Sequence, residues 1–565
     1  MNNMKKLFKI LLVALSFFLT LSCEDYLEKD ATVDTKLSYE QIFSDVHYAP
    51  GFLNNIYNEL PDGYSRFGGA LLAAASDEGV CSNVGSAISL FNKNAINATT
   101  NPDDVWDTMY RGIRKCNIFL KELEPDGIIT LTNSIPESKE GVAVRNYYKG
   151  QALFLRAFYH FELLKRYGNI FYITKVLDPF NEDELFSGTQ STYDQAVDAI
   201  VSDCDAAALL MPAAYPDDSY KGRPISWTPL AFKSRVLLYA ASPLNNPTND
   251  KAKWQRAAIA AKVIVDSKKY TLGALSTIFT SLYNNEIIFA ARAVNRNDIE
   301  NYNYPVSYQG MGLMNPSEDL VQAFGMTAKT YQNRMVDFDP LDPYSLKNTR
   351  KREDRLKYTV FFNGSRLKDT TVSCFVGGKD GLFSSPTATK SGYYMSKFVD
   401  QSLDLAKGNT SLRAWVYMRY AEILLNYAEA LNESDHIANN TAIVNALDLL
   451  RNRANLRPFD TSDKTLLKDQ AEMRKYIKQE RRLELAFEEH RFWDLRRWKD
   501  AETILNQPVK GMRITKDDAG NFTYTVFEAD TRIFDPKLYW YPIPRKEILK
   551  YRNAGKTIVQ NPGWE

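Results

Sequence analysis

The acidic run DFDPLDP, residues 337–343, spaces three carboxylates closely enough to bind a metal ion. Asp337, Asp339 and Asp342 could donate oxygen ligands to Ca²⁺, which prefers carboxylate and carbonyl oxygens. The run lacks the central glycine and the distal glutamate of an EF-hand loop. A solvated acidic turn is the competing interpretation, and the sequence leaves both open. Beyond this candidate calcium site we expect no cofactor.

The histidines form no catalytic or metal-binding pattern. None of the four, His47, His160, His436 and His490, occurs in an HExxH pair or another ligand spacing. The chain also lacks a GxSxG elbow, a phosphate-binding glycine loop and a GxGxxG fingerprint. Two distant carboxylates could still meet to hydrolyse a glycoside, because the sequence does not place them relative to one another. The missing motifs nevertheless favour a protein that is not an enzyme.

The segment ERRLELAFEEHRFWDLRRW combines arginines with aromatic residues, as a nucleic-acid-binding surface would. Its interleaved acids and the net charge of +1 of the whole chain argue against this, so we expect no nucleic-acid partner. The spacing instead predicts a long helix over 466–498, in which Arg491 pairs with Glu488 and Asp494 at i,i+3. One face of this helix would carry Leu483, Ala486, Phe487 and His490.

Cys23 follows an apolar run and precedes two acidic residues, in the segment LSCEDYLEKD. A start with three lysines precedes an apolar stretch at 10–21, which is too short to span a bilayer and is typical of a secretory signal peptide. Ser22 followed by Cys23 resembles a bacterial lipobox, with Thr20 standing where leucine is expected. We therefore predict that Cys23 is lipidated and tethers the protein to a membrane surface. The alternative is an ordinary signal peptide cleaved elsewhere.

Length and composition indicate a large folded protein. At 565 residues, with 44% hydrophobic and 25% charged residues, the chain requires two domains or an extended array. No segment after the signal peptide is apolar for long enough to span a membrane. The remaining cysteines have no CxxC spacing and are expected to be small buried residues, with a Cys81–Cys116 disulfide left open. They are Cys81, Cys116, Cys204 and Cys374.

The hydrophobic periodicity predicts a mainly α fold. The segment GQALFLRAFYHFELLKRYGN is apolar nearly all round, so we expect a central helix that ends at Gly168. Aromatic and alanine residues at helical spacing resemble tetratricopeptide helix pairs, although without a regular 34-residue period. Between about 273 and 400, clustered Pro, Gly, Asn and Tyr predict an irregular, loop-rich α+β insert. Further helices are expected at 41–60, 104–123, 191–210, 228–241 and 252–267.

These patterns divide the chain into six parts. The first two are a signal peptide and a polar tether, and the others are two helical regions, the insert between them and a mixed C-terminal segment. Loop-rich inserts on rigid scaffolds commonly carry binding sites, so we expect the insert to face the ligand. The boundaries are 1–22, 23–40, 41–272, 273–400, 401–500 and 501–565.

The arginine-rich segment, followed by YWYPIPRKEI and NPGW, resembles the C-terminal signature of the SusD/RagB family. Other segments are similar to that family in the same order, so the resemblance covers nearly the whole chain. They are CEDYLE, VWDTMYRGIRKCNIFL, QALFLRAFYHFELLKRYGN, NEIIFAARA and NPSEDLVQAF.

The resemblance implies a nutrient-binding lipoprotein, anchored in a Bacteroidetes outer membrane and facing the cell exterior. Its scaffold would be tetratricopeptide-like, with an irregular subdomain packed on it. Such proteins sit as a hinged lid over a SusC-like TonB-dependent transporter barrel, to which they deliver a glycan without cleaving it. Glu24 and Asp25 resemble the signal that directs such lipoproteins to the cell surface.

The resemblance also points to two ligand-binding loops, SDEGVCSNVGSAISLFNKN and RAVNRNDIENYNYPVSYQG. Tyrosine suits such a surface, because its apolar ring carries a hydroxyl. Replacing the three tyrosines of the second loop is expected to weaken binding without changing the melting temperature. The alternative is that each residue only packs its own loop. The candidate residues are Asp77, Asn83, Phe91, Asn92, Tyr302, Tyr304 and Tyr308.

Two other functions fit the same scaffold. A peptide-binding member of the family would have the same sequence features as a glycan binder. An adaptor that uses its helical repeats as a docking surface would bind the transporter and no small ligand.

Overall fold

The structure, a computed structural model, describes residues 37–43, 45, 47–123, 139–216, 218–325, 343–344, 352–459 and 468–565. Two of the predicted sites lie outside these residues. One is the lipidation site Cys23, and the other is the calcium candidate formed by Asp337, Asp339 and Asp342.

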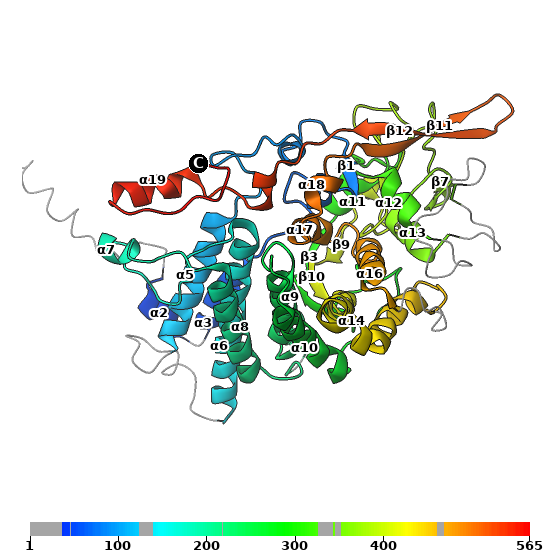
Figure 1. Ribbon diagram of the computed structural model, residues 1–565. Helices are drawn as coiled ribbons and strands as arrows, with labels where there is room; N and C mark the ends of the chain where they lie inside the picture. The colour runs from blue at the N-terminus through cyan, green and yellow to red at the C-terminus, as the bar shows by residue number, and fades with distance from the viewer. Residues whose placement is uncertain are drawn as a thin grey trace, which may run out of the picture.

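A row of long helices forms one half of the molecule and runs from left to right across the lower part of Figure 1. Each helix packs against the next along the chain, as in tetratricopeptide arrays. The mainly α prediction is therefore confirmed. The row consists of α5 (Trp106–Glu122), α6 (Lys139–Tyr167), α8 (Tyr193–Leu210), α9 (Trp227–Ala241), α10 (Lys251–Ser267), α14 (Tyr420–Arg453) and α16 (Gln470–Glu484).

Local sequence explains these helices well. Helix α6 buries both its Phe158 and Tyr159 sides, and Gly168 follows it with φ +68° as a left-handed residue. Helix α8 begins with a capping box between Thr192 and Gln195. Helix α14 changes direction at Asp435, whose φ of −156° and ψ of 91° are not helical. The stretch at 41–60 forms two helices, α2 (Tyr39–Phe43) and α3 (Ala49–Tyr57), instead of one.

The prediction of one continuous helix over 466–498 is wrong. Helix α16 ends at Glu484, and α17 (His490–Arg497) starts after a break in which Phe487 and Glu489 have φ of +64° and +65°. The break turns Glu488 inward, where it contacts Lys397 at 2.6 Å, instead of toward Arg491. The predicted i,i+3 pairs of Arg491 are therefore absent from this described segment, and Arg491 pairs with Asp77 instead.

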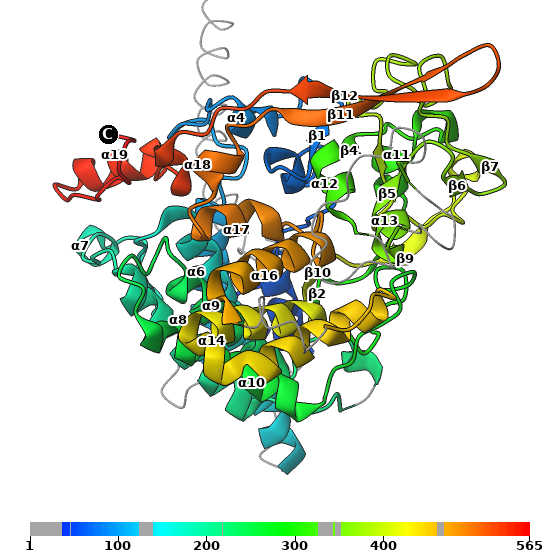
Figure 2. The same ribbon diagram turned by 45° about the vertical axis from the view of Figure 1, so that its right-hand side comes forward.

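The other half of the molecule consists of short antiparallel strand pairs joined by loops. Their pairing is β1 (Gly79–Cys81) with β4 (Met314–Pro316), β2 (Ile287–Ala290) with β10 (Val416–Arg419), β3 (Val294–Arg296) with β9 (Ser411–Arg413), β5 (Val360–Phe361) with β8 (Tyr394–Met395), and β6 (Arg366–Leu367) with β7 (Thr370–Thr371). The short helices α11 (Asp298–Asn303), α12 (Glu318–Ala323) and α13 (Asp354–Thr359) lie among them. In Figure 2 most of these elements gather at the upper right, while β2 and β10 lie near the centre.

The C-terminal segment joins the two halves. The long hairpin β11 (Val509–Lys516) and β12 (Phe522–Asp530) extends across the top of both ribbon views. Beyond it, the Tyr541 hydroxyl donates to Asp103 at 2.9 Å, and Asp103 also pairs with Arg166 of α6 at 2.9 Å. The remaining helices are α4 (Ser89–Asn92), α7 (Glu182–Leu185), α18 (Ala501–Ile504) and α19 (Arg545–Asn553), with 3-10 turns at Leu72–Ala75, Asp218–Tyr220, Val306–Tyr308, Leu405–Lys407 and Pro536–Tyr539.

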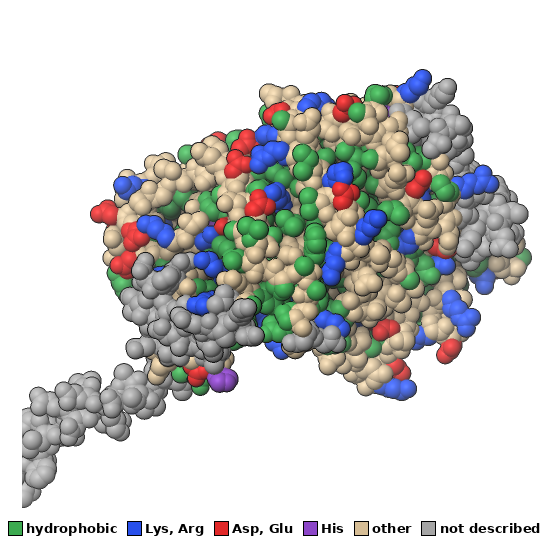
Figure 3. Space-filling model, turned by 90° about the horizontal axis from the view of Figure 1, so that it is seen from below, with side chains coloured by type: hydrophobic (Ala, Val, Ile, Leu, Met, Phe, Trp, Pro, Cys, Tyr) green, Lys and Arg blue, Asp and Glu red, His purple; other side chains and the backbone are tan. Residues whose placement is uncertain are grey.

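The described part of the chain contains buried free thiols at Cys81, Cys116, Cys204 and Cys374. The structure therefore has no Cys81–Cys116 disulfide, which the sequence had left open. Within the described part of the chain, no group of three or more His, Cys, Asp or Glu side chains is arranged to hold a metal ion. No helix in that part is long and apolar enough to cross a membrane. In Figure 3 basic and acidic side chains are interspersed over the visible face, consistent with the net charge of +1.

Candidate functional site

Three loops from distant parts of the chain meet at one corner of the molecule, and we call the surface that they form the loop face (residues 82–90, 302–312 and 370–390). The Ser82 amide donates to the Leu313 carbonyl at 2.9 Å, next to the β1–β4 pair. The Ser307 amide donates to Asp380 at 2.9 Å, and the hydroxyls of Tyr308 and Thr370 are hydrogen-bonded. These contacts hold the loops together on a rigid scaffold, where binding sites commonly occur.

The loop face exposes both apolar and amide side chains. Phe383 is 82% exposed, Val84 71% and Met311 39%. Tyr302 and Tyr308 are half-buried, so part of each ring remains accessible. Asn83 and Gln309 are exposed and carry amide donors and acceptors. Apolar rings beside a few polar groups are the chemistry of a site that binds an uncharged polar ligand by stacking and hydrogen bonding.

The structure brings three of the predicted ligand residues to the loop face: Asn83, Tyr302 and Tyr308. The Asn83 side chain accepts a hydrogen bond from the Gly85 amide at 3.0 Å, which orients its loop. The Tyr302 ring lies against Gly69, where a Cβ atom would approach the ring Cγ to 2.4 Å. Gly69 has φ +89°, so the close approach and the backbone both require glycine there.

Tyr304 is not part of this surface. Its side chain is fully buried, and its hydroxyl donates to the carbonyls of Asp400 at 2.6 Å and Leu403 at 3.1 Å. The alternation of tyrosines in ENYNYPVSY therefore does not place them on one accessible face, because α11 ends at Asn303 and the chain turns there. Tyr304 is a packing residue in this structure.

Asp77 lies beneath the loop face in an ion-pair cluster. Arg491 donates to its two carboxylate oxygens at 2.7 and 2.9 Å, and Arg482 lies 3.0 Å away. Burial raises the pKa of the Asp77 carboxyl, but Arg482 and Arg491 outweigh that effect and hold it well below its usual range. The carboxylate is thus engaged within the protein by two arginines of distant segments.

Phe91 is buried, and Asn92 is half-buried. The Phe91 ring is 4% exposed and packs on the rings of Phe492 and Tyr541, with centroid distances of 5.5 and 5.7 Å. The Asn92 side chain donates to the Ala74 carbonyl at 2.9 Å. Both residues tie the first loop to the scaffold. In this structure Phe91 and Tyr304 are buried, and the side chains of Asp77 and Asn92 are hydrogen-bonded within the protein.

Glu78, next to Asp77, is a buried carboxyl with an unusual pKa. The Phe487 amide donates to Oε2 at 3.2 Å, while Oε1 has no hydrogen-bond partner among the described residues. Burial, reinforced by the neighbouring Asp77 carboxylate, raises the pKa of Glu78 to about 8. The group is therefore largely neutral at pH 7 in the folded protein and ionised in the unfolded chain.

Glu78→Gln should flatten the dependence of stability on pH. Between about pH 5 and 8 the folded protein holds a proton that the unfolded chain releases, so stability falls as pH rises, by up to about 1.4 kcal/mol per pH unit. We expect the variant to exceed the native protein in free energy of unfolding by on the order of 1–3 kcal/mol at pH 7.5, and the difference to shrink toward pH 5. Urea denaturation at several pH values measures this. Glu502→Gln, at an exposed position, is the control. If the free energy of unfolding changes with pH in the same way in the native and Glu78→Gln proteins, the raised pKa of Glu78 is contradicted.

None of the predicted ligand residues lies in the third loop of the loop face, although this loop belongs to the insert that was expected to face the ligand. It carries Phe383 between glycines and a Ser-Ser-Pro turn, in GGKDGLFSSP. A single large apolar residue among turn residues was the available signal, because it has no periodic partners with which to enter a core. Periodicity alone did not show that this loop meets the other two.

Comparisons with known proteins agree with this architecture. The model of the SusD family matches residues 283–564, and a second model, described as "Starch-binding associating with outer membrane", matches residues 25–238. A SusD-like protein of Formosa agariphila is 22% identical over 519 residues, which cover 91% of this chain and 95% of that protein.

Solved structures show the same fold. The crystal structure of a SusD-like protein from Bacteroides fragilis has a TM-score of 0.75 at 25% identity and covers 93% of this chain and 98% of that one. A SusD-like carbohydrate-binding protein, also from Bacteroides fragilis, has a TM-score of 0.73 at 23% identity, with 91% and 99% coverage. Surface glycan-binding protein A from Bacteroides fluxus has a TM-score of 0.61 at 19% identity, with 92% and 99% coverage. The two family matches together extend over most of the sequence, and the chain belongs to the SusD/RagB family.

Proposed function

We propose that the protein is a cell-surface lipoprotein that captures a glycan on its loop face and passes it, uncleaved, to a SusC-like TonB-dependent transporter barrel. The observation that carries this proposal is the convergence of three distant loops that expose Tyr302, Tyr308 and Phe383 beside amide side chains. Rings and amides together suit an uncharged, hydroxyl-rich polymer.

The family relationship supports the choice of ligand and location. Two of the structural relatives are named as carbohydrate-binding and surface glycan-binding proteins, and one of the matching family models is described as starch-binding and associated with the outer membrane. Lipidation at Cys23, orientation toward the exterior and delivery to the barrel are parts of the proposal that rest on the sequence resemblance.

Native affinity electrophoresis tests the proposal. The mature protein without residues 1–23 is run through gels that contain different soluble polysaccharides. Retardation by one glycan class supports glycan capture. Free migration in every gel, combined with saturable binding of oligopeptides, would replace it with a peptide-binding function. Co-purification with the barrel and no saturable ligand of either kind would leave the adaptor function.

The double variant Tyr308→Ala with Phe383→Ala should weaken glycan binding about tenfold or more, because each accessible ring offers stacking area worth on the order of 1 kcal/mol. Phe383 is largely exposed and Tyr308 half-buried, so the melting temperature should change little. The shift in gel retardation with polysaccharide concentration gives the apparent Kd.

Phe180→Ala is the matched control. Phe180 is 94% exposed and lies next to α7, on the opposite side of the molecule from β7 in Figure 1. The Phe180→Ala substitution removes an exposed ring and leaves the loop face unchanged. Equal affinity of the double variant and the native protein would refute the placement of the glycan on the loop face.

A further inference from the structure

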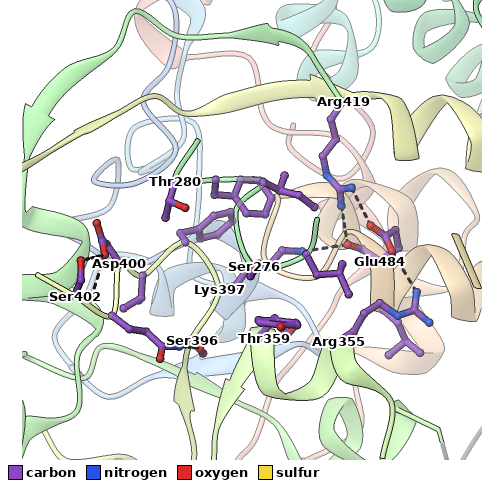
Figure 4. Close-up of a pocket in the computed structure, with 18 residues that line it drawn as sticks. Ser276, Thr280, Arg355, Thr359, Ser396, Lys397, Asp400, Ser402, Arg419 and Glu484 are labelled. Carbon is purple, nitrogen blue, oxygen red and sulfur yellow. Dashed lines mark hydrogen bonds and ion pairs between the residues drawn. The ribbon is translucent and has the colours of Figure 1, made fainter. Parts of the chain in front are cut away.

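A cavity of about 310 Å³, none of whose lining residues belongs to the loop face, lies between the loop 275–280, α13, the loop 396–402 and the end of α16. Figure 4 shows the Asp400–Ser402 contact at one end of it and the ion pairs of Arg355 and Arg419 with Glu484 at the other. The volume is at the lower end of the range of about 300–1,000 Å³ that is typical of small-molecule sites. The cavity therefore suits a small molecule and not a polymer.

The basic groups of the cavity already pair with carboxylates. Arg355 donates to Glu353, Glu480 and Glu484, and Arg419 to Glu286, Glu484 and Glu488. Lys397 contacts Glu488 at 2.6 Å and the Glu484 carbonyl at 3.1 Å. An anionic ligand would enter without an available counter-ion and would lose its hydration, so the site disfavours anions.

The other polar lining groups are hydroxyls, an amide and the Asp400 carboxylate, which accepts from the Ser402 amide and hydroxyl at 3.1 and 2.6 Å. The apolar lining includes aromatic rings. Thr359 is buried, Ser276 and Thr280 are exposed, and their side-chain hydroxyls form no hydrogen bond with another described residue. Gln401 is exposed and its amide nitrogen reaches Ser396 only at 3.4 Å. The Phe279 ring forms an apolar wall, backed by Lys397 and Arg419 at 5.5 and 5.8 Å from its centroid.

We propose that this cavity is a second ligand site, which takes one uncharged sugar ring. A pyranose offers hydroxyls to the partnerless Ser276, Thr280 and Thr359 groups and an apolar ring face to Phe279, while it brings no charge that would need neutralisation. The site is separate from the loop face and does not depend on polymer capture there.

Binding of single sugars tests the proposal directly. The probes are neutral monosaccharides (glucose, galactose, mannose, xylose and N-acetylglucosamine) and, as a charged comparison, glucuronic and galacturonic acid, each titrated by calorimetry and by ligand-observed NMR. We expect saturable binding of at least one neutral sugar and no binding of the uronic acids. Uronic acids that bind as well as the neutral sugars would overturn the proposal, as would the absence of saturable binding by every neutral sugar.

Two variants locate the bound sugar. Thr280→Trp blocks the mouth from an exposed position and should abolish the binding, while Thr359→Val removes one buried hydroxyl at nearly constant volume and should weaken it about fivefold or more. Phe383→Ala, on the loop face, should leave sugar binding unchanged. Sugar binding that survives Thr280→Trp and Thr359→Val would refute the cavity as the site, and sugar binding lost in Phe383→Ala would assign it to the loop face.

The experiments test the two proposed sites independently. Loss of polysaccharide retardation in the loop-face double variant, with sugar binding retained, concerns the proposed function alone. Loss of sugar binding in Thr280→Trp, with retardation retained, concerns the cavity alone.

Discussion

Glu484→Gln is expected to lower the free energy of unfolding by about 3–5 kcal/mol, the loss typical when one member of a buried ion-pair network is removed. The Glu484 carboxylate is 1% exposed and pairs with Arg419 at 2.8 Å, with Arg355 at 3.3 Å and with Arg453. Its neutralisation leaves three buried guanidinium groups short of one negative charge. Urea denaturation of the native and variant proteins at pH 7 measures the loss.

The expected loss depends on pH in a defined direction. Burial raises the pKa of the Glu484 carboxyl, but Arg453, Arg419 and Arg355 outweigh it and hold the pKa well below its ordinary value of 4.5. The stability that this carboxylate contributes is fully present above about pH 4.5 and is lost as the pH falls through the folded-state pKa. The difference in free energy of unfolding between the native and Glu484→Gln proteins should therefore become smaller at acidic pH.

Glu472→Gln on the same helix is the control, because Glu472 is partly exposed and pairs with Lys475 at the surface. Its effect should stay within about 0.5 kcal/mol. An effect of Glu484→Gln no larger than that of Glu472→Gln would show that the cluster does not stabilise the fold.

Tyr304→Ala should also cost about 3–5 kcal/mol, as expected for deletion of a buried aromatic side chain. The ring is fully buried and the hydroxyl donates to two carbonyls of the loop that follows β8. This expectation replaces the one drawn from the sequence, in which all three tyrosines of the second loop could be removed without a change in melting temperature.

Comparison variants separate the role of the Tyr304 ring from that of its hydroxyl. Tyr304→Phe keeps the ring and leaves two carbonyls without their donor, so about 1–2 kcal/mol should be lost. Tyr308→Ala, at a half-buried position, should cost about 1 kcal/mol or less. Denaturation midpoints measure all three, and equal losses for Tyr304→Ala and Tyr308→Ala would contradict the different burial of the two residues.

The helical half of the fold was predictable because its determinants are local. The all-round apolar pattern of 150–167 and the alanine-rich stripe of α10 specify helices that must be covered by neighbours. The helix break at Phe487 and Glu489 was not predictable by the same reasoning, because both residues are ordinary helix formers in a periodic segment. Tertiary contacts of Glu484 and Glu488 with arginines and a lysine from other elements stabilise the left-handed residues there.

The candidate site was only partly predictable. The sequence gives the composition of a loop but not which of its side chains another segment covers. Tyr304 and Tyr308 are four positions apart, yet one is buried under 400–403 and the other faces the surface. Likewise, Asp77 has the composition of a ligand-binding residue, and only the distant Arg491 shows that its carboxylate is engaged.

The pairing of Asp77 with Arg491 also determines when the loop face can form during synthesis of the chain. The two residues are 414 positions apart, and the Arg532 side chain that donates to the Gly79 carbonyl is 453 positions from its acceptor. Because synthesis proceeds from the N-terminus, the first loop of the loop face stays without its supporting charges until almost the whole chain exists. Closing such long loops is slow, so the nascent chain should remain open until it is nearly complete. A chain that stops before α17 would lack Arg491 and Arg532, and the first loop of the loop face would have no support from either side chain.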